Sequence, residues 1–180
     1  MGLIETVLQY LFPPAPEPLG AVRRGAGRPF VVRGRVVPRD QIQSPLTERR
    51  CVYYRYLVEE WRRTSIDLPG GGQGLWHAVE ADEAIAEFYI DDGTGRAVVE
   101  PQAAHVAFTS PCGPEPVSMP SGRRASELRI EAGDWVEVQG VLAEIDDLLD
   151  GERGYREVAM RLALRAVEGG RIRIRLLRRG

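Results

Sequence analysis

Alternation of apolar and polar positions is the main pattern along this chain. Because successive side chains of a strand point to opposite faces of a sheet, a two-residue period in segments rich in β-branched and aromatic residues predicts strands. Segments of this kind lie at 29–37, 51–63, 75–81, 133–145, 155–167 and 171–179. Gly34 interrupts the first segment and indicates a bulge or a bend there. In the last segment Ile172, Ile174 and Leu176 alternate with arginines, which predicts a half-buried strand with an Arg-lined outer face.

A tight hairpin is the clearest local prediction, within residues 87–101. Phe88 and Ile90 are expected on one face and Tyr89 on the other, with the second strand continuing through Ala97 and Val99. The turn between them combines glycines, which tolerate a positive φ, with aspartates, which bond their own backbone. The turn and loop residues expected to shape the backbone are Asp91, Asp92, Gly93, Gly95, Gly133 and Asp134.

Helical patterns are rare. Apolar residues of segment 2–12 recur at helical spacing, and a Pro-rich linker follows up to Pro18. We therefore expect residues 1–18 to form an amphipathic helix with its linker, and residues 19–180 to form one β-rich domain. A further short helical turn is expected at 125–130.

The order of these elements predicts the fold class. A strand, a hairpin, a short helix and two more strands follow one another, as in an OB-fold, with an extra hairpin inserted at 50–80. We predict a mostly β protein: a small OB-like barrel or open barrel with an inserted hairpin and one or two short helices.

Charge modifies this picture. All 24 basic residues are Arg, the net charge is −2 and the pI is near 5.8. An acidic balance argues against nucleic acid as the main partner, since phosphate-binding surfaces usually show a basic excess. The charges are unevenly distributed, however: acids gather at 80–92 and 144–152, and arginines at 23–63 and 161–179. A local basic face is therefore compatible with the sequence.

Cysteine usage and hydropathy favour a cytoplasmic protein. The chain carries two cysteines, no apparent secretory signal and no run of about 20 apolar residues. The helix expected at 2–12 lacks the basic face typical of a membrane-bound helix, so docking on its own domain or a partner is favoured. Membrane association through residues 2–12 is the alternative.

Candidate catalytic groups do not form a coherent set. The residues Cys51, His77, His105 and Cys112 lack the short paired spacings of zinc sites, and neither thiol has a local activating signature. Asp91 and Asp92 fit a turn better than a metal or acid–base pair, and Gly93–Gly95 is not followed by the Lys of a phosphate loop. The sequence therefore predicts no catalytic residue, no metal and no cofactor.

Aromatic strand residues are the remaining candidates for binding. Stacking of a ligand on them competes with simple core packing, which the acidic pI favours. The binding residues selected on this basis are Tyr53, Tyr54, Arg55, Tyr56, Trp61, Trp76 and Tyr89.

Several motifs in order resemble one family. They run from Ser44-Pro45 through Cys51–Arg55 and Trp76 to the segment Phe88–Gly95 and then Gly133-Asp134. Over about residues 30–145 this order is similar to the GIDE-type, or "beside a membrane", domain of MULAN-type membrane-anchored E3 ubiquitin ligases and their prokaryotic relatives. Those ligases add transmembrane helices and a RING, which needs about eight Cys/His ligands for two zinc ions. Two cysteines cannot supply a RING, so the resemblance implies the recognition module alone.

Three functions follow from these observations. The leading hypothesis is a non-catalytic module that recognises a protein partner or a small ligand. The alternative is an OB-like domain that binds single-stranded nucleic acid, suggested by the hairpin and the aromatic strands. A Cys-dependent enzyme is the third and least favoured hypothesis.

Overall fold

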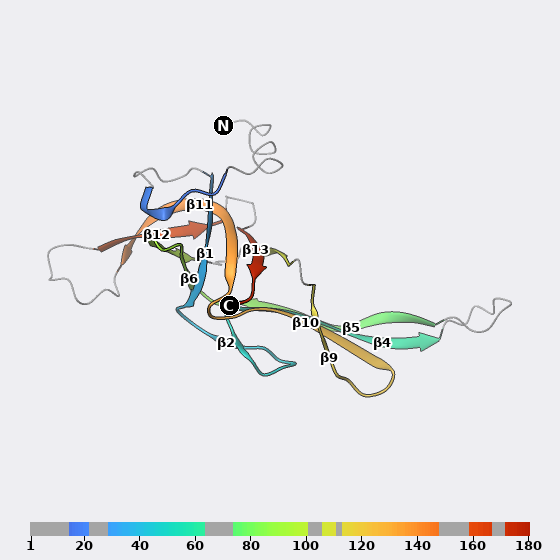
Figure 1. Cartoon of the computed structure of the whole chain (residues 1–180). Coiled ribbons are helices and arrows are strands. Elements are labelled where there is room, and N and C mark those ends of the chain that lie inside the picture. The colour runs from blue at the N-terminus through green and yellow to red at the C-terminus, as the bar shows by residue number, and fades with distance from the viewer. Residues whose placement is uncertain are drawn as a thin grey trace.

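The computed structural model describes residues 15–21, 29–63, 74–100, 106–110, 113–147, 159–166 and 172–180, and within them strands dominate (Figure 1). One short 3-10 helix, Leu19–Ala21, is the only helix of these residues. The helix expected at 2–12 lies outside them. The chain just before Leu19 lies against the first strand, because the Glu17 N–H donates to the Val31 carbonyl at 2.9 Å.

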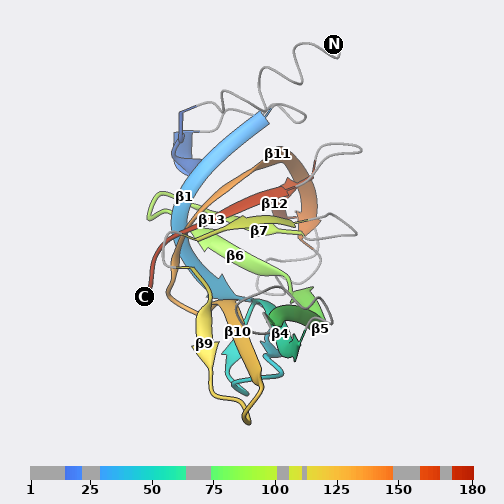
Figure 2. The same cartoon turned by 90° about the vertical axis from the view of Figure 1, so that its right-hand side faces the viewer.

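Five strands close into a barrel, which confirms the predicted fold class (Figure 2). In order around the barrel they are β1 (Pro29–Pro38), β6 (Phe88–Asp91), β7 (Arg96–Val99), β12 (Ala159–Arg165) and β11 (Trp135–Asp147). The ring closes because β1 pairs with β6 through its second half and with β11 through its first half. Only β7 and β12 are parallel; the other neighbours in the ring are antiparallel. Two further strands, β13 (Ile172–Arg178) and β8 (Val106–Thr109), extend the sheet from β11.

The barrel interior holds the main hydrophobic core. It contains the inward residues of every barrel strand, including Val32, Phe88, Ile90, Val138 and Leu164, all with essentially no exposed surface. Burying side chains of this size stabilises a fold by about 1.5–3 kcal/mol each. The predicted alternation of β13 is confirmed, since Ile172, Ile174 and Leu176 are buried and Arg175 is exposed.

Gly34 marks the place where β1 passes from β11 to β6. A Cβ atom at this position would lie 2.6 Å from the backbone oxygen of Asp91. Any side chain would therefore separate the two strands whose approach closes the barrel. The glycine noticed in the sequence has its physical reason in this close approach.

The predicted hairpin connects β6 and β7 as expected. Phe88 and Ile90 are buried in the core and Tyr89 is half-buried. Gly93 has a φ of +83°, the left-handed region that favours glycine. The Asp92 N–H donates to the Gly95 carbonyl at 3.3 Å, which closes the turn.

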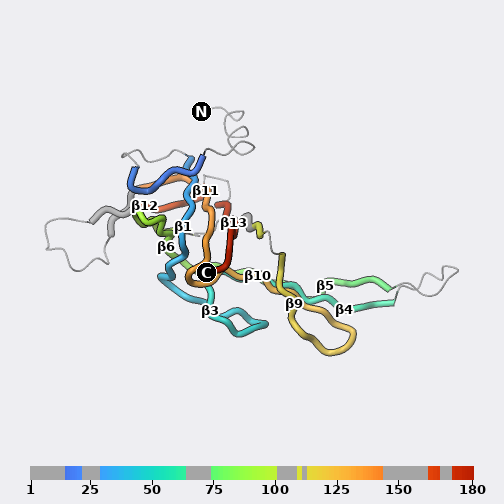
Figure 3. Tube along the Cα trace, in the orientation of Figure 1, coloured from blue at the N-terminus to red at the C-terminus, as the bar shows by residue number. Residues whose placement is uncertain are grey.

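A second sheet extends away from the barrel, and we call it the arm (Figures 1 and 3). Its four strands, in spatial order, are β5 (Gly74–Ile85), β4 (Tyr53–Arg63), β10 (Arg123–Ile130) and β9 (Glu115–Val117). The predicted hairpin of 51–63 with 75–81 is confirmed by the antiparallel β4–β5 pair. A smaller apolar cluster around Tyr56, Val58 and Ala125 lies on one face of the arm. Two short strands, β2 (Ile42–Gln43) and β3 (Arg50–Cys51), pair beside it.

Two local predictions are wrong. Residues 125–130 form most of strand β10 and not a helical turn. Positions 127–130 are buried on both faces, so burial does not alternate there, and pairing with β4 overrides the local helical preference. The strand expected at 51–63 is interrupted at Val52, whose N–H and carbonyl bond to Ile130 and Ala86 respectively.

Candidate functional site

The arm carries most of the predicted binding residues, and its register separates them onto two faces. On β4, Arg55 and Leu57 point to one side, while Tyr54, Tyr56 and Val58 point to the other, because side chains of a strand alternate. We call the side of Arg55 the concave face and the side of Tyr56 the packed face. The packed face holds the small apolar cluster, so the concave face is the one open to a partner.

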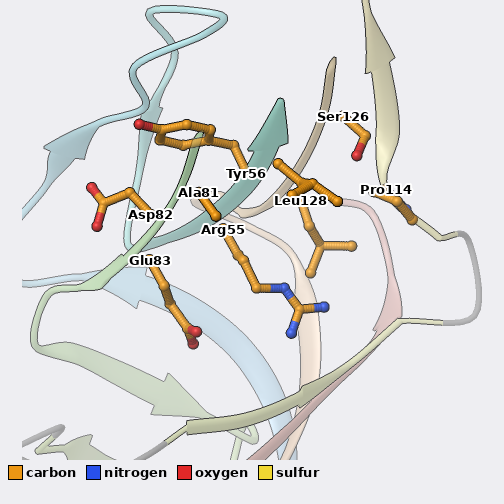
Figure 4. A pocket seen from close by; sticks show the side chains of 9 residues that line it. Arg55, Tyr56, Ala81, Asp82, Glu83, Pro114, Ser126 and Leu128 are labelled. Atoms are coloured by element: carbon orange, nitrogen blue, oxygen red, sulfur yellow. The ribbon is translucent and has the colours of Figure 1, made fainter. Parts of the chain in front are cut away.

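A cavity of about 730 Å³ lies on the concave face (Figure 4). The register places Arg55 opposite Glu83 of β5 on one side and opposite Leu128 of β10 on the other. Figure 4 shows these three side chains projecting to the same side of the sheet, and Tyr56 projecting away from them. Leu57, Ala81, Ser126 and Pro114 complete most of the lining. The cavity thus combines an apolar floor with two opposite charges.

Arg55 is the cation of this cavity that has no close ion pair. The exposed Arg55 guanidinium has no carboxylate within 4 Å among the residues that the structure describes. Glu83, directly across the sheet, instead accepts a hydrogen bond from the Tyr53 hydroxyl at 2.9 Å. The guanidinium can therefore receive a carboxylate or carbonyl oxygen from a bound molecule.

Exposed apolar side chains gather farther along the arm. The rings of Trp61 and Trp76 meet edge to face with centroids 5.3 Å apart, and Arg124 lies 4.5 Å over the Trp76 ring. Arg124 is held there by Glu59, which accepts two hydrogen bonds at 2.6 and 2.9 Å. Trp61 is 45% exposed, and Leu75 and Val79 are 57% and 40% exposed. Trp61 and Trp76 share the concave face, whereas Leu75, next to Trp76 on β5, points to the opposite face.

The three tyrosines of β4 brace the hairpin and are not open stacking platforms. Each hydroxyl donates to an acid of β5: Tyr53 to Glu83, Tyr54 to Asp82 and Tyr56 to Glu80, at 2.7–2.9 Å. The hydrogen bond to Glu80, with burial, raises the pKa of Tyr56 to about 12. Burial, with the Glu83 bond, raises the pKa of Tyr53 as well. The acidic residues of β5 thus accept hydrogen bonds from the tyrosine hydroxyls and favour their protonated, neutral form.

A buried ionic cluster lies on the packed face, where Glu127 is opposite Tyr56 and Arg129 is opposite Tyr54, and it was not predicted from the sequence. Arg129 is 1% exposed and bonds Glu127 and Glu115 at 2.6 Å and Glu131 at 2.9 Å. Glu127 has no exposed surface and accepts further bonds from Ser44, Thr47 and the Leu46 N–H. Burial opposes its ionisation, but the Thr47 hydroxyl and Arg129 outweigh burial and lower the pKa of Glu127. Because Arg129 and Glu127 pair with each other and are sealed from solvent, they join the turn at 44–47 to β10 and offer no reactive group.

The spacing of three charged residues in the sequence is consistent with this cluster. Glu127, Arg129 and Glu131 are spaced two apart, which on a strand places them on one face. In the helical turn predicted at 125–130, residues spaced two apart would not share a face, so the cluster was not predicted. The last residues of the chain reach the same region, since Arg179 bonds Asp134 and Glu115 at 3.0 Å and the Gly180 N–H donates to Asp134 at 2.9 Å (Figure 3).

The two aspartates of the β6–β7 turn act on the backbone. Asp91 accepts from Arg96 at 2.7 Å and from the Gly93 N–H at 2.9 Å, and these bonds lower its pKa. Asp92 accepts N–H bonds from Leu19, Thr94 and Gly95 at 2.6–2.9 Å. Burial opposes ionisation of Asp92, but these donors prevail and lower the pKa of its carboxyl. Gly133, with a φ of +88°, and Asp134, which accepts from the Glu131 N–H, shape the next loop in the same way.

The remaining candidates lie apart from the arm cavity. Tyr89 is on the barrel, beside Val37 and Val98. Cys51 is completely buried, burial raises the pKa of its thiol to about 11, and the thiol lies 3.6 Å from the Ile42 carbonyl. His77 is exposed on β5, and His105 and Cys112 lie outside the described residues. Among the described residues no group of three or more His, Cys, Asp or Glu could hold a metal ion.

Two further findings concern relatives and membranes. No helix of the described residues is long and apolar enough to cross a bilayer. Comparison of the chain with protein-family models, with curated proteins and with solved structures finds no match in any of the three. The resemblance to GIDE-type domains therefore stays a prediction.

Proposed function

We propose that this protein is a non-catalytic recognition module that binds a protein partner on the concave face of the arm. The observation that carries this proposal is the pairing of an unmatched cation with exposed aromatic surface on one face. Arg55 lines the cavity, and Trp61 and Trp76 follow on the same side of the sheet. Arg and Trp are enriched at the energetic centres of protein interfaces.

The shape of the face defines what the partner must offer. The exposed Trp61 calls for an apolar side chain, and Arg55 calls for a carboxylate. The resemblance to GIDE-type domains supports the same function, since in that family the domain is thought to recognise a substrate or ligand. The buried Cys51 thiol, with its raised pKa, lacks the thiolate character that a nucleophile needs.

Site-specific photo-crosslinking tests the proposal. A benzophenone side chain placed at Ala81, an exposed residue of the cavity lining, should capture a discrete partner in the source cells. The same group at the exposed Thr94 on the barrel is the matched control and should not capture that partner.

The purified partner then allows a quantitative test. Trp61→Ala and Arg55→Gln should each weaken its binding about tenfold or more, as truncation of an interface anchor does. Arg175→Gln, an equal charge loss on the barrel, should leave the affinity unchanged. Equal affinity of all four proteins, the wild type included, would contradict the arm as the binding face.

A further inference from the structure

Arginines distant in the sequence lie side by side on the outer face of the barrel. The register forms a cross-strand row in which Asp91 of β6 is opposite Arg35 of β1, Arg35 is opposite Trp135 of β11, and Trp135 is opposite Arg178 of β13. Arg96 of β7 extends the row beyond Asp91. A second row, two residues along the strands, contains Arg33, Glu137 and Arg175. We call these two rows the arginine face.

The arginine face carries a surplus of positive charge. Its five guanidinium groups stand against two carboxylates, Asp91 and Glu137, which leaves three positive charges. Asp91 pairs with Arg96 at 2.7 Å, and Glu137 pairs with Arg33 at 2.6 Å. Arg175 approaches Glu137 only to 3.9 Å. Arg35 has no carboxylate within 4 Å among the residues that the structure describes.

A pocket of about 520 Å³ lies at the centre of the first row. Arg35 and Trp135 line it, together with the backbone of Gly133 and the β6–β7 turn. A Cβ atom at Gly133 would lie 3.3 Å from the Arg35 guanidinium, so the bare glycine gives that guanidinium room. Asp92 also lines the pocket, but backbone N–H groups of Leu19, Thr94 and Gly95 already occupy its oxygens.

Trp135 adds a planar surface to this pocket. The guanidinium of Arg178 lies 4.9 Å from its ring centroid, which fixes the ring between two arginines of the row. Guanidinium groups bind phosphates through paired hydrogen bonds, and an indole ring stacks on a nucleobase. Neighbouring strands are about 4.8 Å apart, so the five-strand row, followed around the curved barrel surface, is about 19 Å long, enough for several nucleotides.

We infer that the arginine face binds single-stranded nucleic acid, with phosphates on Arg35, Arg175 and Arg178 and a base in the pocket beside Trp135. An anionic membrane would favour apolar side chains that insert among the lipids. The exposed large apolar side chains of the described residues, Trp61, Leu75 and Val79, all lie on the arm. The net charge of the whole chain argues against nucleic acid as a partner. That net charge conceals the surplus of arginines on this face, because the acidic residues of strand β5 offset them.

Fluorescence anisotropy with a labelled 20-nucleotide oligothymidylate, in 50 and 200 mM salt, tests the inference. The wild type should bind, and more weakly at the higher salt, because bound phosphates release counterions. Arg35→Gln combined with Arg178→Gln should weaken binding about tenfold or more and flatten the salt dependence. Trp135→Ala should weaken binding at both salt concentrations about tenfold, since stacking is largely insensitive to salt.

Matched control variants distinguish binding at the arginine face from a general effect of the protein's charge. Arg55→Gln combined with Arg62→Gln removes the same charge from the arm and should leave oligonucleotide binding unchanged. Thermal unfolding of each variant checks that the fold persists. Equal loss in both double variants, or no salt-sensitive binding by the wild type, would overturn the inference. Binding to vesicles of anionic phospholipid with none to the oligonucleotide would overturn the assignment to nucleic acid.

Discussion

The barrel and the arm are held together by different interactions. The barrel encloses a continuous apolar core in which most inward side chains have no exposed surface. The arm has a small apolar cluster on one face and relies on cross-strand polar pairs, namely the tyrosine–acid bonds of the β4–β5 hairpin and the buried Arg129 cluster. The arm uses few apolar residues for its own packing, and other apolar residues, such as Trp61 and Leu75, are exposed.

The difference matters for function. A closed barrel has no free edge between its own strands, and it presents arginines on a rigid frame. The arm offers an open face of aromatic and charged groups. One region is therefore suited to a polyanion and the other to a protein surface, within the same short chain.

The largest expected effect concerns the ionic cluster of the arm. Arg129→Ala leaves the buried Glu127 without its cation, and breaking such a pair costs about 3–5 kcal/mol in the free energy of unfolding. Urea unfolding followed by fluorescence in a Trp135→Phe background would report mainly the tryptophans of the arm. Far-UV circular dichroism would report both sheets.

Fluorescence and circular dichroism together show whether the arm unfolds before the barrel. We expect the fluorescence transition of Arg129→Ala to occur at lower urea than the circular dichroism transition, because the arm loses its support first. Coincident transitions at lowered urea would mean that arm and barrel unfold as one unit. An unchanged midpoint would contradict the role given to the cluster.

The stability of the barrel is expected to depend most on Gly34, where strand β1 closes the barrel. Gly34→Ala places a methyl group 2.6 Å from the Asp91 carbonyl oxygen, and such overpacking costs about 1–3 kcal/mol. Gly93→Ala is the control with open space around it, at a φ of +83°, where only the backbone conformation costs about 1–2 kcal/mol. Chemical denaturation should rank Gly34→Ala as the more destabilising of the two, and the reverse order would disprove closure by β1.

The smallest effect concerns the tyrosines of β4 at high pH. The pKa of Tyr56 is raised from 10.0 to about 12, so the folded arm holds a proton that the unfolded chain releases. This stabilisation is complete below pH 10 and is lost as the pH rises toward 12. Glu80→Gln removes the neighbouring charge and should shift one tyrosine titration, followed by absorbance at 295 nm, toward pH 10. A titration curve identical to that of the wild type would show that the hydrogen bond does not hold the proton.

Local patterns predicted much of the architecture. The alternation in 171–179, the Asp-Gly turn and the β4–β5 hairpin all appear where they were expected, because they depend on neighbours in the sequence. The failure at 125–130 has the opposite cause. Strand β10 forms through pairing with β4, which is remote in sequence, and it buries the charged Glu127 and Arg129, so local preference did not predict the strand.

The sequence by itself determined the β-rich class and the hairpins, since backbone preferences and two-residue periods are local properties. Tertiary structure alone decided which charges meet. It buried Arg129 among three carboxylates, placed Arg55 in an open cavity and aligned Arg35, Trp135 and Arg178 across three strands. Strand pairing sets contacts between residues as far apart in the sequence as Arg35 and Trp135, and no window of the sequence contains that information.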